Sequence, residues 1–164
     1  MSKEIDWSVF KRRVAIQSDV NTIFEHWISQ NGIEKWFLSR ARFYDQTGQL
    51  KDANAIIQKG DSYKWEWHGS DELGEGIILD YIPSEKVNFT FLGCEVLVRV
   101  VNEAGENVLE IQQSSIATDE ASKLHYYVGC TRGWTFYMAN LKSILEGGID
   151  LRNRNKAIKQ VINS

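Results

Sequence analysis

A long run of period-two segments gives way to helical spacing near residue 117, and that change limits the folds open to the chain. From residue 39 to residue 116, apolar side chains recur at every second position in one short segment after another, as in strands. Residues 121–146 then carry apolar side chains at helical spacing, and Gly147 and Gly148 follow as a stop signal. Pro83 is the only proline, so long elements are not interrupted. We therefore expect an antiparallel meander followed by one long helix.

Turn residues divide the period-two region into separate strands. In the clearest one, DSYKWEWHG at 61–69, three aromatic residues face one side and charged or polar residues face the other. If the aromatic side faces the interior, Glu66 faces solvent. The sheet is expected to have six to seven strands, drawn from segments 9–17, 40–45, 61–69, 75–82, 86–93, 95–102 and 108–116, with a weaker strand at 54–60.

Two short helices are expected after the first strand. Residues 18–29 open with Ser18 or Asp19 as the N-cap, and Gly32 is expected to break this helix. Residues 33–39 indicate a second helical turn. The long helix, with Thr118 or Asp119 as its cap, then covers the dry face of the sheet. We expect one domain at 1–148 and a polar tail at 149–164, whose pattern is compatible with a short helix over 156–162.

Composition excludes several classes of function. The formal charge is −3 and no basic stripe is present, so no nucleic-acid partner is expected. No apolar run approaches the ~20 residues of a membrane span, and the start lacks an apolar signal segment. Cys94 and Cys130 form neither a disulfide framework nor a zinc motif. We expect a cytoplasmic protein without a metal or other cofactor.

Three stretches resemble a known family in their order and spacing: YKWEWHG, GEGIILDYIPSEKVNFTF and GCTRGWTFYMANLKSILEGG. They are similar to the START-like helix-grip superfamily, and within it to the domain called activator-of-heat-shock-protein-90-ATPase-like. The resemblance covers about residues 9–148. It implies an α+β helix-grip fold, in which a curved antiparallel sheet wraps around a long C-terminal helix. It also implies a deep pocket, used by different members for lipids, hormones, polyketides or client surfaces.

Aromatic residues are concentrated on the elements that such a fold makes face one another. The chain has six Trp, six Tyr and seven Phe. A filled core and a ligand pocket would use the same residues, and the sequence leaves both interpretations open. We predict a site for a small hydrophobic or amphipathic, lipid-like ligand. The candidate lining residues are Trp36, Phe43, Trp65, Trp67, Tyr81, Phe89, Phe91, Trp134, Tyr137, Met138 and Leu141.

Two glycines, Gly129 and Gly133, share one face of the predicted long helix. Each costs up to ~1 kcal/mol relative to alanine in a helix interior. They therefore indicate either a close approach to the sheet or space left for a ligand. Nearby, Tyr126 and Tyr127 could direct a hydroxyl to the pocket mouth. Arg132 could contact an anion, although a solvent-facing position is the expected one.

Two alternatives to ligand binding remain open. The first is a protein-interaction module that docks on heat-shock protein 90 or another partner; relatives known as chaperone activators have a separate N-terminal chaperone-binding domain, which we do not expect here. The second, less favoured, is an enzyme acting in the cavity. It would need a buried ionisable pair, for which Glu66, His68, His125 and Tyr126 are the candidates. No motif supports a catalytic assignment, so no catalytic residue is predicted.

Overall fold

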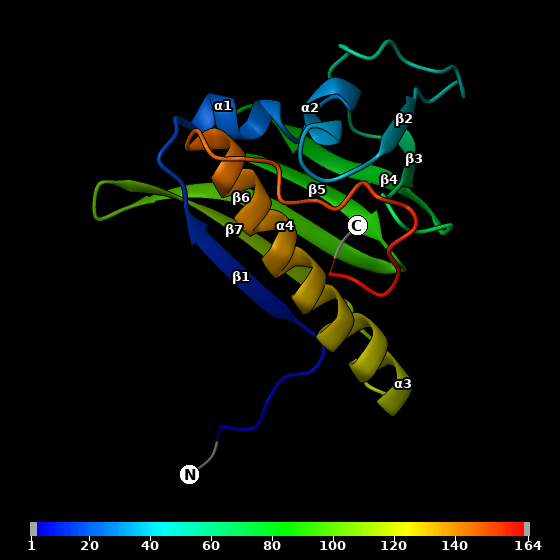
Figure 1. The fold of residues 1–164 in the computed structure, drawn as a ribbon, viewed down its shortest axis with the longest axis vertical. Coiled ribbons are helices and arrows are strands. Elements are labelled where there is room, and N and C mark those ends of the chain that lie inside the picture. The colour runs from blue at the N-terminus through cyan, green and yellow to red at the C-terminus, as the bar shows by residue number, and fades with distance from the viewer. Residues whose placement is uncertain (1–2, 163–164) are drawn as a thin grey trace.

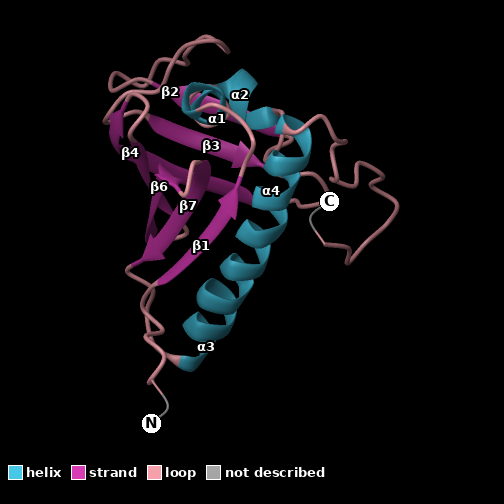
Figure 2. Cartoon of the chain, turned by 90° about the vertical axis from the view of Figure 1, so that its left-hand side faces the viewer, coloured by secondary structure: helices cyan, strands magenta, loops and turns pink. Residues whose placement is uncertain are grey.

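A seven-stranded antiparallel sheet curves around one long helix in the computed structural model, which describes residues 3–162 (Figures 1 and 2). The strand order is β1-β7-β6-β5-β4-β3-β2, so the first strand pairs with the last. This is the α+β helix-grip architecture that the sequence predicts. The strands are β1 (Phe10–Ala15), β2 (Arg40–Tyr44), β3 (Ser62–Glu66), β4 (Leu73–Ile82), β5 (Lys86–Phe91), β6 (Cys94–Glu103) and β7 (Glu106–Ser114).

The prediction of a strand at 54–60 is wrong. This segment is a loop between β2 and β3 in which Ile57 is buried and Ile56 is exposed. The Ile57 N–H donates to the carbonyl of Ile28 at 2.9 Å, and Lys51 Nζ donates to the carbonyl of Ile56 at 2.8 Å. The backbone groups that would form a strand ladder are therefore used by the segment between the two short helices and by a lysine of the loop itself.

The two short helices, α1 (Val20–Glu25) and α2 (Gln30–Glu34), close one end of the fold (Figure 1). Asp19 caps α1 and Ser29 caps α2, each accepting a backbone N–H with its side chain. The expectation that Gly32 breaks a helix is wrong, because Gly32 lies inside α2. A Cβ at this position would lie 2.0 Å from the carbonyl oxygen of Glu25. Gly32 therefore lets α2 pack directly against the end of α1.

The predicted long helix is present but is not uniform. It begins with α3 (Glu120–Ser122), which Asp119 caps, continues as a π-helical segment η1 (Lys123–Val128), and ends as α4 (Gly129–Leu145). One face of α4 is buried against the sheet and includes Trp134, Tyr137, Met138 and Leu141. A π-helical turn is wider than an α-helical one and often occurs at functional sites.

The C-terminal segment folds back over the domain (Figure 1). One arginine, Arg152, attaches it there. The Arg152 side chain is almost fully buried and donates to the carbonyls of Leu38, Lys35 and Glu34 at 2.9, 2.9 and 3.1 Å. It also pairs with Asp150 at 2.8 Å. Arg152 thereby satisfies carbonyl groups at and beyond the C-terminal end of α2.

No helix forms over residues 156–162, which contradicts that part of the sequence interpretation. Side chains compete with the backbone for the hydrogen bonds that a helix needs. The Asn153 Oδ1 accepts the N–H of Asn155 at 3.0 Å, and the Asn155 Oδ1 accepts the N–H of Ala157 at 3.0 Å. Such local turns favour non-helical backbone.

Asp150 is expected to make stability depend on acid pH. Burial alone would raise the pKa of its carboxyl, but hydrogen bonds from Arg152 and Arg154 and the charge of Arg152 outweigh burial and lower the pKa well below its ordinary 3.8. The stabilisation is therefore fully present above that ordinary pKa and is lost as pH falls below it, when the unfolded chain takes up a proton first. Asp150→Asn should lower the urea midpoint at neutral pH, and the gap to wild type should narrow by about pH 3. A gap that stays constant with pH would contradict this assignment.

Candidate functional site

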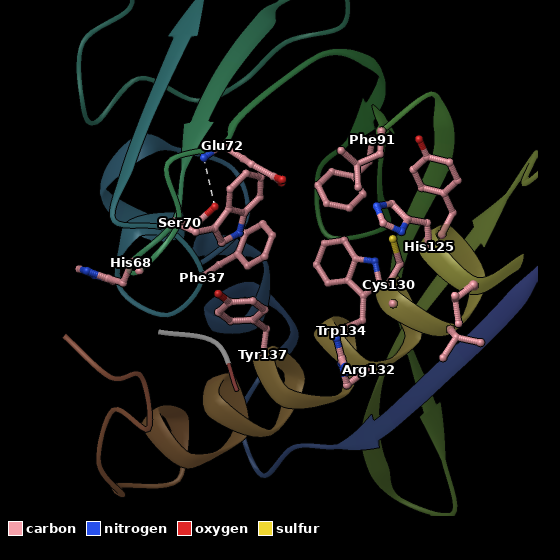
Figure 3. Close-up of a pocket in the computed structure, with 18 of the residues that line it drawn as sticks. Phe37, His68, Ser70, Glu72, Phe91, His125, Cys130, Arg132, Trp134 and Tyr137 are labelled. Atoms are coloured by element: carbon pink, nitrogen blue, oxygen red, sulfur yellow. Dashed lines mark hydrogen bonds between the residues drawn. The ribbon is translucent and has the colours of Figure 1, made fainter. Parts of the chain in front are cut away.

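A cavity of about 600 Å³ opens between the long helix and one end of the sheet. Its helix side is formed by η1 and the first half of α4. Its other side is formed by residues 67–70 and Glu72, which follow β3, and by the end of β5 (Figure 3). Phe37, which follows α2, and Val161 of the C-terminal segment complete the lining. The volume is within the range of small-molecule sites.

Aromatic rings form the inner wall of the cavity. The ring of Phe37 stacks on that of Trp134 at 5.1 Å and meets those of Trp67 and Tyr137 edge-on at 5.7 and 4.8 Å. The Phe91 ring lies 5.4 Å from that of Trp134. The Trp134 Nε1–H donates to Gln113 Oε1 at 3.0 Å. Because these rings support one another, the wall is pre-formed rather than assembled around a ligand.

The two helix glycines leave space beside this wall. Both Gly129 and Gly133 line the cavity. A Cβ on Gly133 would meet no atom within 4 Å, and one on Gly129 would meet only the carbonyl oxygen of Leu124, at 3.7 Å. Neither glycine is therefore required for close packing. Of the two interpretations open from the sequence, the geometry agrees with space beside the rings.

Tyr137 carries a polar group in the aromatic wall. The residue is only 6% exposed, but its hydroxyl is not fully buried, and it forms no hydrogen bond with a protein group among residues 3–162. The ring extends from α4, and its hydroxyl points toward the loop that carries Ser70 (Figure 3). Burial raises the pKa of Tyr137 to about 12. The hydroxyl therefore keeps its proton at neutral pH and is a hydrogen-bond donor.

Charged and titratable groups surround the cavity mouth. Burial lowers the pKa of His68, and the positive charges of Arg152, Arg154 and Lys156 lower it further while Asp150 opposes them. Arg132 and Glu72 are exposed on the rim, and Arg132 forms no ion pair within the described chain. His68 is thus expected to be neutral at pH 7, in an environment of net positive charge.

The cavity wall also contains a thiol. Burial raises the pKa of Cys130, whereas the neighbouring Gln113 side chain opposes that rise. The thiol is therefore protonated at neutral pH and is a poor nucleophile.

No catalytic arrangement joins the residues considered for an enzyme. His68, His125 and Tyr126 line the cavity, but Glu66 turns away and pairs with Arg42 at 3.0 Å. Among residues 3–162, no hydrogen bond joins two of the titratable side chains that line the cavity. In the same range no cluster of three or more His, Cys, Asp or Glu is suited to a metal ion.

The structure divides the eleven candidate lining residues into three sets. Four of them line the cavity, and they are Trp67, Phe91, Trp134 and Tyr137. Tyr81 on β4 is half-buried and does not reach it. The other six pack in the core, and they are Trp36, Phe43, Trp65, Phe89, Met138 and Leu141.

The core group lies where the two short helices close over the sheet. Trp65 stacks on Tyr63 with ring centroids 3.8 Å apart, and Trp36 meets Trp27 edge-on at 4.6 Å. A filled core and an open cavity therefore both occur, at different ends of the same group of aromatic rings.

Tyr126 and Tyr127 also differ in their placement. Tyr126 lines the cavity, while Tyr127 packs on Trp7 and Phe10.

Several lining residues are not in the predicted set. The loop residues Gly69, Ser70 and Glu72 come from a turn whose direction the sequence does not specify. Leu92, Leu124 and Val128 are apolar, lie on the rim and are 45%, 67% and 46% exposed. For the lining residues of η1 and α4, the usable sequence signal was the pair Gly129 and Gly133, because both lie on the helix face that opens on the cavity.

Comparison with known proteins identifies the family. Residues 17–146 match the model of the family described as "Activator of Hsp90 ATPase homolog 1-like protein". The match spans most of the chain, so the chain belongs to this family. No curated protein matches the sequence significantly.

Solved structures of low sequence identity share the fold. The protein SSP2350 from Staphylococcus saprophyticus superposes with a TM-score of 0.69 at 15% identity, covering 88% of this chain and 96% of that one. The Aha1 dimer from Colwellia psychrerythraea gives 0.65 at 15% identity, with 85% and 97% coverage. An AHSA1-like protein from Aeromonas hydrophila gives 0.59 at 13% identity, with 85% and 92% coverage. At these identities the likeness concerns the fold alone.

No helix among the described residues is both long and apolar enough to span a bilayer.

Proposed function

We propose that the protein binds a small hydrophobic or amphipathic molecule in the cavity between α4 and the sheet. The observation that carries this proposal is the space beside Gly133, next to the wall of Phe37, Trp134 and Phe91. Burying an apolar ligand there would contribute roughly 25 cal/mol per Å² of apolar surface. A few polar groups on the wall would orient the ligand.

Gly133→Leu should remove ligand binding without unfolding the protein. The new side chain enters empty space, and leucine has a higher helix propensity than glycine. We expect wild type to bind the neutral fluorophore N-phenyl-1-naphthylamine saturably, one molecule per chain. In Gly133→Leu the affinity should fall about tenfold or more, as expected when ~1.4 kcal/mol or more of contact is lost.

Ala139→Leu is the matched control for this experiment. Ala139 lies on the same helix but is exposed and does not line the cavity. Its variant should bind the fluorophore as wild type does. Two results would count against the proposal: no saturable binding to wild type, or equal binding to wild type and Gly133→Leu.

A second candidate function is docking on a protein partner related to the chaperone system. It is favoured by the family, whose description refers to activation of the Hsp90 ATPase, and by the exposed apolar residues Leu92, Leu124 and Val128 on the cavity rim. Exposed apolar surface of this kind is typical of interaction sites. If this function holds, the protein should change the ATPase rate of the chaperone from its own host. A Leu124→Lys variant should then lose the effect, while an unchanged ATPase rate with wild type would exclude it.

A further inference from the structure

One hydroxyl at the cavity wall has no partner in the described protein. Tyr137 is 6% exposed as a residue, but its hydroxyl is not fully buried and forms no hydrogen bond with a protein group among residues 3–162. The neighbouring Trp134 differs, since its Nε1–H donates to Gln113. The Tyr137 hydroxyl points toward the loop that carries Ser70, which forms the other side of the cavity (Figure 3). It is therefore available to a ligand, in place of the water that otherwise satisfies it.

A ligand group that accepts a hydrogen bond can pair with this hydroxyl. Because burial raises the pKa of Tyr137 to about 12, the hydroxyl is a donor at neutral pH. An oxygen on the ligand can therefore accept from it. A charged oxygen forms a bond roughly twice as strong as a neutral one does.

The charges at this end of the cavity favour an anion. Arg152, Arg154 and Lys156 lie close enough to His68 to lower its pKa, and Asp150 is the acid that opposes them there. Arg152 and Arg154 both pair with the single carboxylate of Asp150, so these three side chains together carry a net positive charge. The carboxylate of Glu72 is exposed on the rim and offsets part of this charge, and solvent screens it and the exposed Arg154 and Lys156 alike.

The remainder of the wall suits an apolar body. From Tyr137 the lining continues through Phe37, Trp134 and Phe91 and reaches Leu92 and Leu124 at the rim. A molecule with its polar group at Tyr137 would lay its apolar part along these rings. The lining thus has one polar end and one apolar end.

We propose that the natural ligand is an apolar molecule that ends in a carboxylate, and that the Tyr137 hydroxyl donates a hydrogen bond to that carboxylate. This inference rests on the proposed function, because it names the chemical class of the molecule that the cavity binds. Tyr137 acts here as a specificity determinant and takes part in no covalent step.

Competition between matched ligands tests the inference. Dodecanoic acid, dodecan-1-ol and dodecylamine have the same apolar chain and differ in the terminal group. Each is titrated against bound N-phenyl-1-naphthylamine at about pH 8, where the acid and the amine are charged. The acid should displace the fluorophore at about tenfold lower concentration than the alcohol, and the amine should be weakest.

Tyr137→Phe and Tyr127→Phe separate the hydroxyl from other effects. Both remove one hydroxyl, but Tyr127 packs against Trp7 and Phe10 outside the cavity. Tyr137→Phe should lower affinity for the acid about tenfold and leave that for the alcohol nearly unchanged, while Tyr127→Phe should behave as wild type.

The outcomes distinguish the two proposals. If the fluorophore binds but acid and alcohol compete equally, or if Tyr137→Phe keeps the preference for the acid, the carboxylate inference is overturned and ligand binding stands. If the fluorophore and all three chain molecules fail to bind, the proposed function and the inference fall together.

Discussion

Gly32→Ala is expected to destabilise the protein by about 3 kcal/mol, at the upper end of single substitutions. The added Cβ would lie 2.0 Å from the Glu25 oxygen and 3.2 Å from the Cα of His26. Both are backbone atoms, so no side-chain rotation relieves the overlap, and α2 must move away from α1. That movement would also strain the bond from Trp36 Nε1 to the carbonyl of His26, now 2.7 Å long. Urea denaturation followed by circular dichroism measures the change.

The matched control is the same exchange at Gly133. Alanine there meets no atom within 4 Å and has the higher helix propensity. Gly133→Ala should therefore be neutral or stabilising by up to about 1 kcal/mol. Equal losses of stability in the two variants would show that the close approach at Gly32 is not the cause.

Arg152→Met is the second substitution with a large expected effect, a loss of about 3 kcal/mol. A methionine side chain replaces much of the aliphatic part of arginine but has no guanidinium. The carbonyls of Leu38, Lys35 and Glu34 therefore lose their hydrogen-bond donor. It also removes one of the two arginines paired with Asp150. The free energy of unfolding from urea denaturation should fall, and amide protons of α2 should exchange faster with solvent.

Arg154→Met is the control that separates the loss of the buried contacts of Arg152 from the loss of one positive charge. Arg154 pairs with the same carboxylate at 2.7 Å, but its side chain is 63% exposed. Exposed ion pairs contribute about 0 to 1 kcal/mol, so this variant should stay within that range of wild type. A comparable loss in both variants would indicate that net charge, rather than the buried contacts of Arg152, stabilises the segment.

The strands and the helix could be predicted because their periodicity is local. Alternation in β5 places Val87, Phe89 and Phe91 on the buried face, and that alternation is visible in the sequence. The caps could be narrowed to Ser18 or Asp19 and to Thr118 or Asp119 for the same reason, and Asp19 and Asp119 each accept an N–H three residues away.

Features that depend on distant contacts could not be predicted. Arg152 contacts Leu38 across 114 positions, and nothing in the polar tail indicates that one of its arginines is buried. Gly32 was predicted to end a helix because the sequence does not show its contact with the Glu25 carbonyl. Only the turn between the two helices brings these groups together.

The cavity could be predicted in part. The glycine face of the helix and the aromatic excess indicated where a ligand space would lie, and Trp67, Phe91, Trp134 and Tyr137 do line it. The sequence could not separate these four from Trp65 or Phe89. In the strands, core rings and cavity rings both occupy the inward-facing positions of the same period-two pattern. Which rings face the cavity depends on how the helices pack over the sheet, and this is a property of the assembled fold.

Native mass spectrometry of the protein purified from its own host tests ligand binding most directly. Wild type should carry one small molecule per chain, released on denaturation and identifiable by its mass, and Gly133→Leu prepared in the same way should not. Ala139→Leu should retain the molecule. Wild-type protein that shows only the mass of the polypeptide, and that also fails to take up N-phenyl-1-naphthylamine, would contradict the assignment of the cavity as a ligand site.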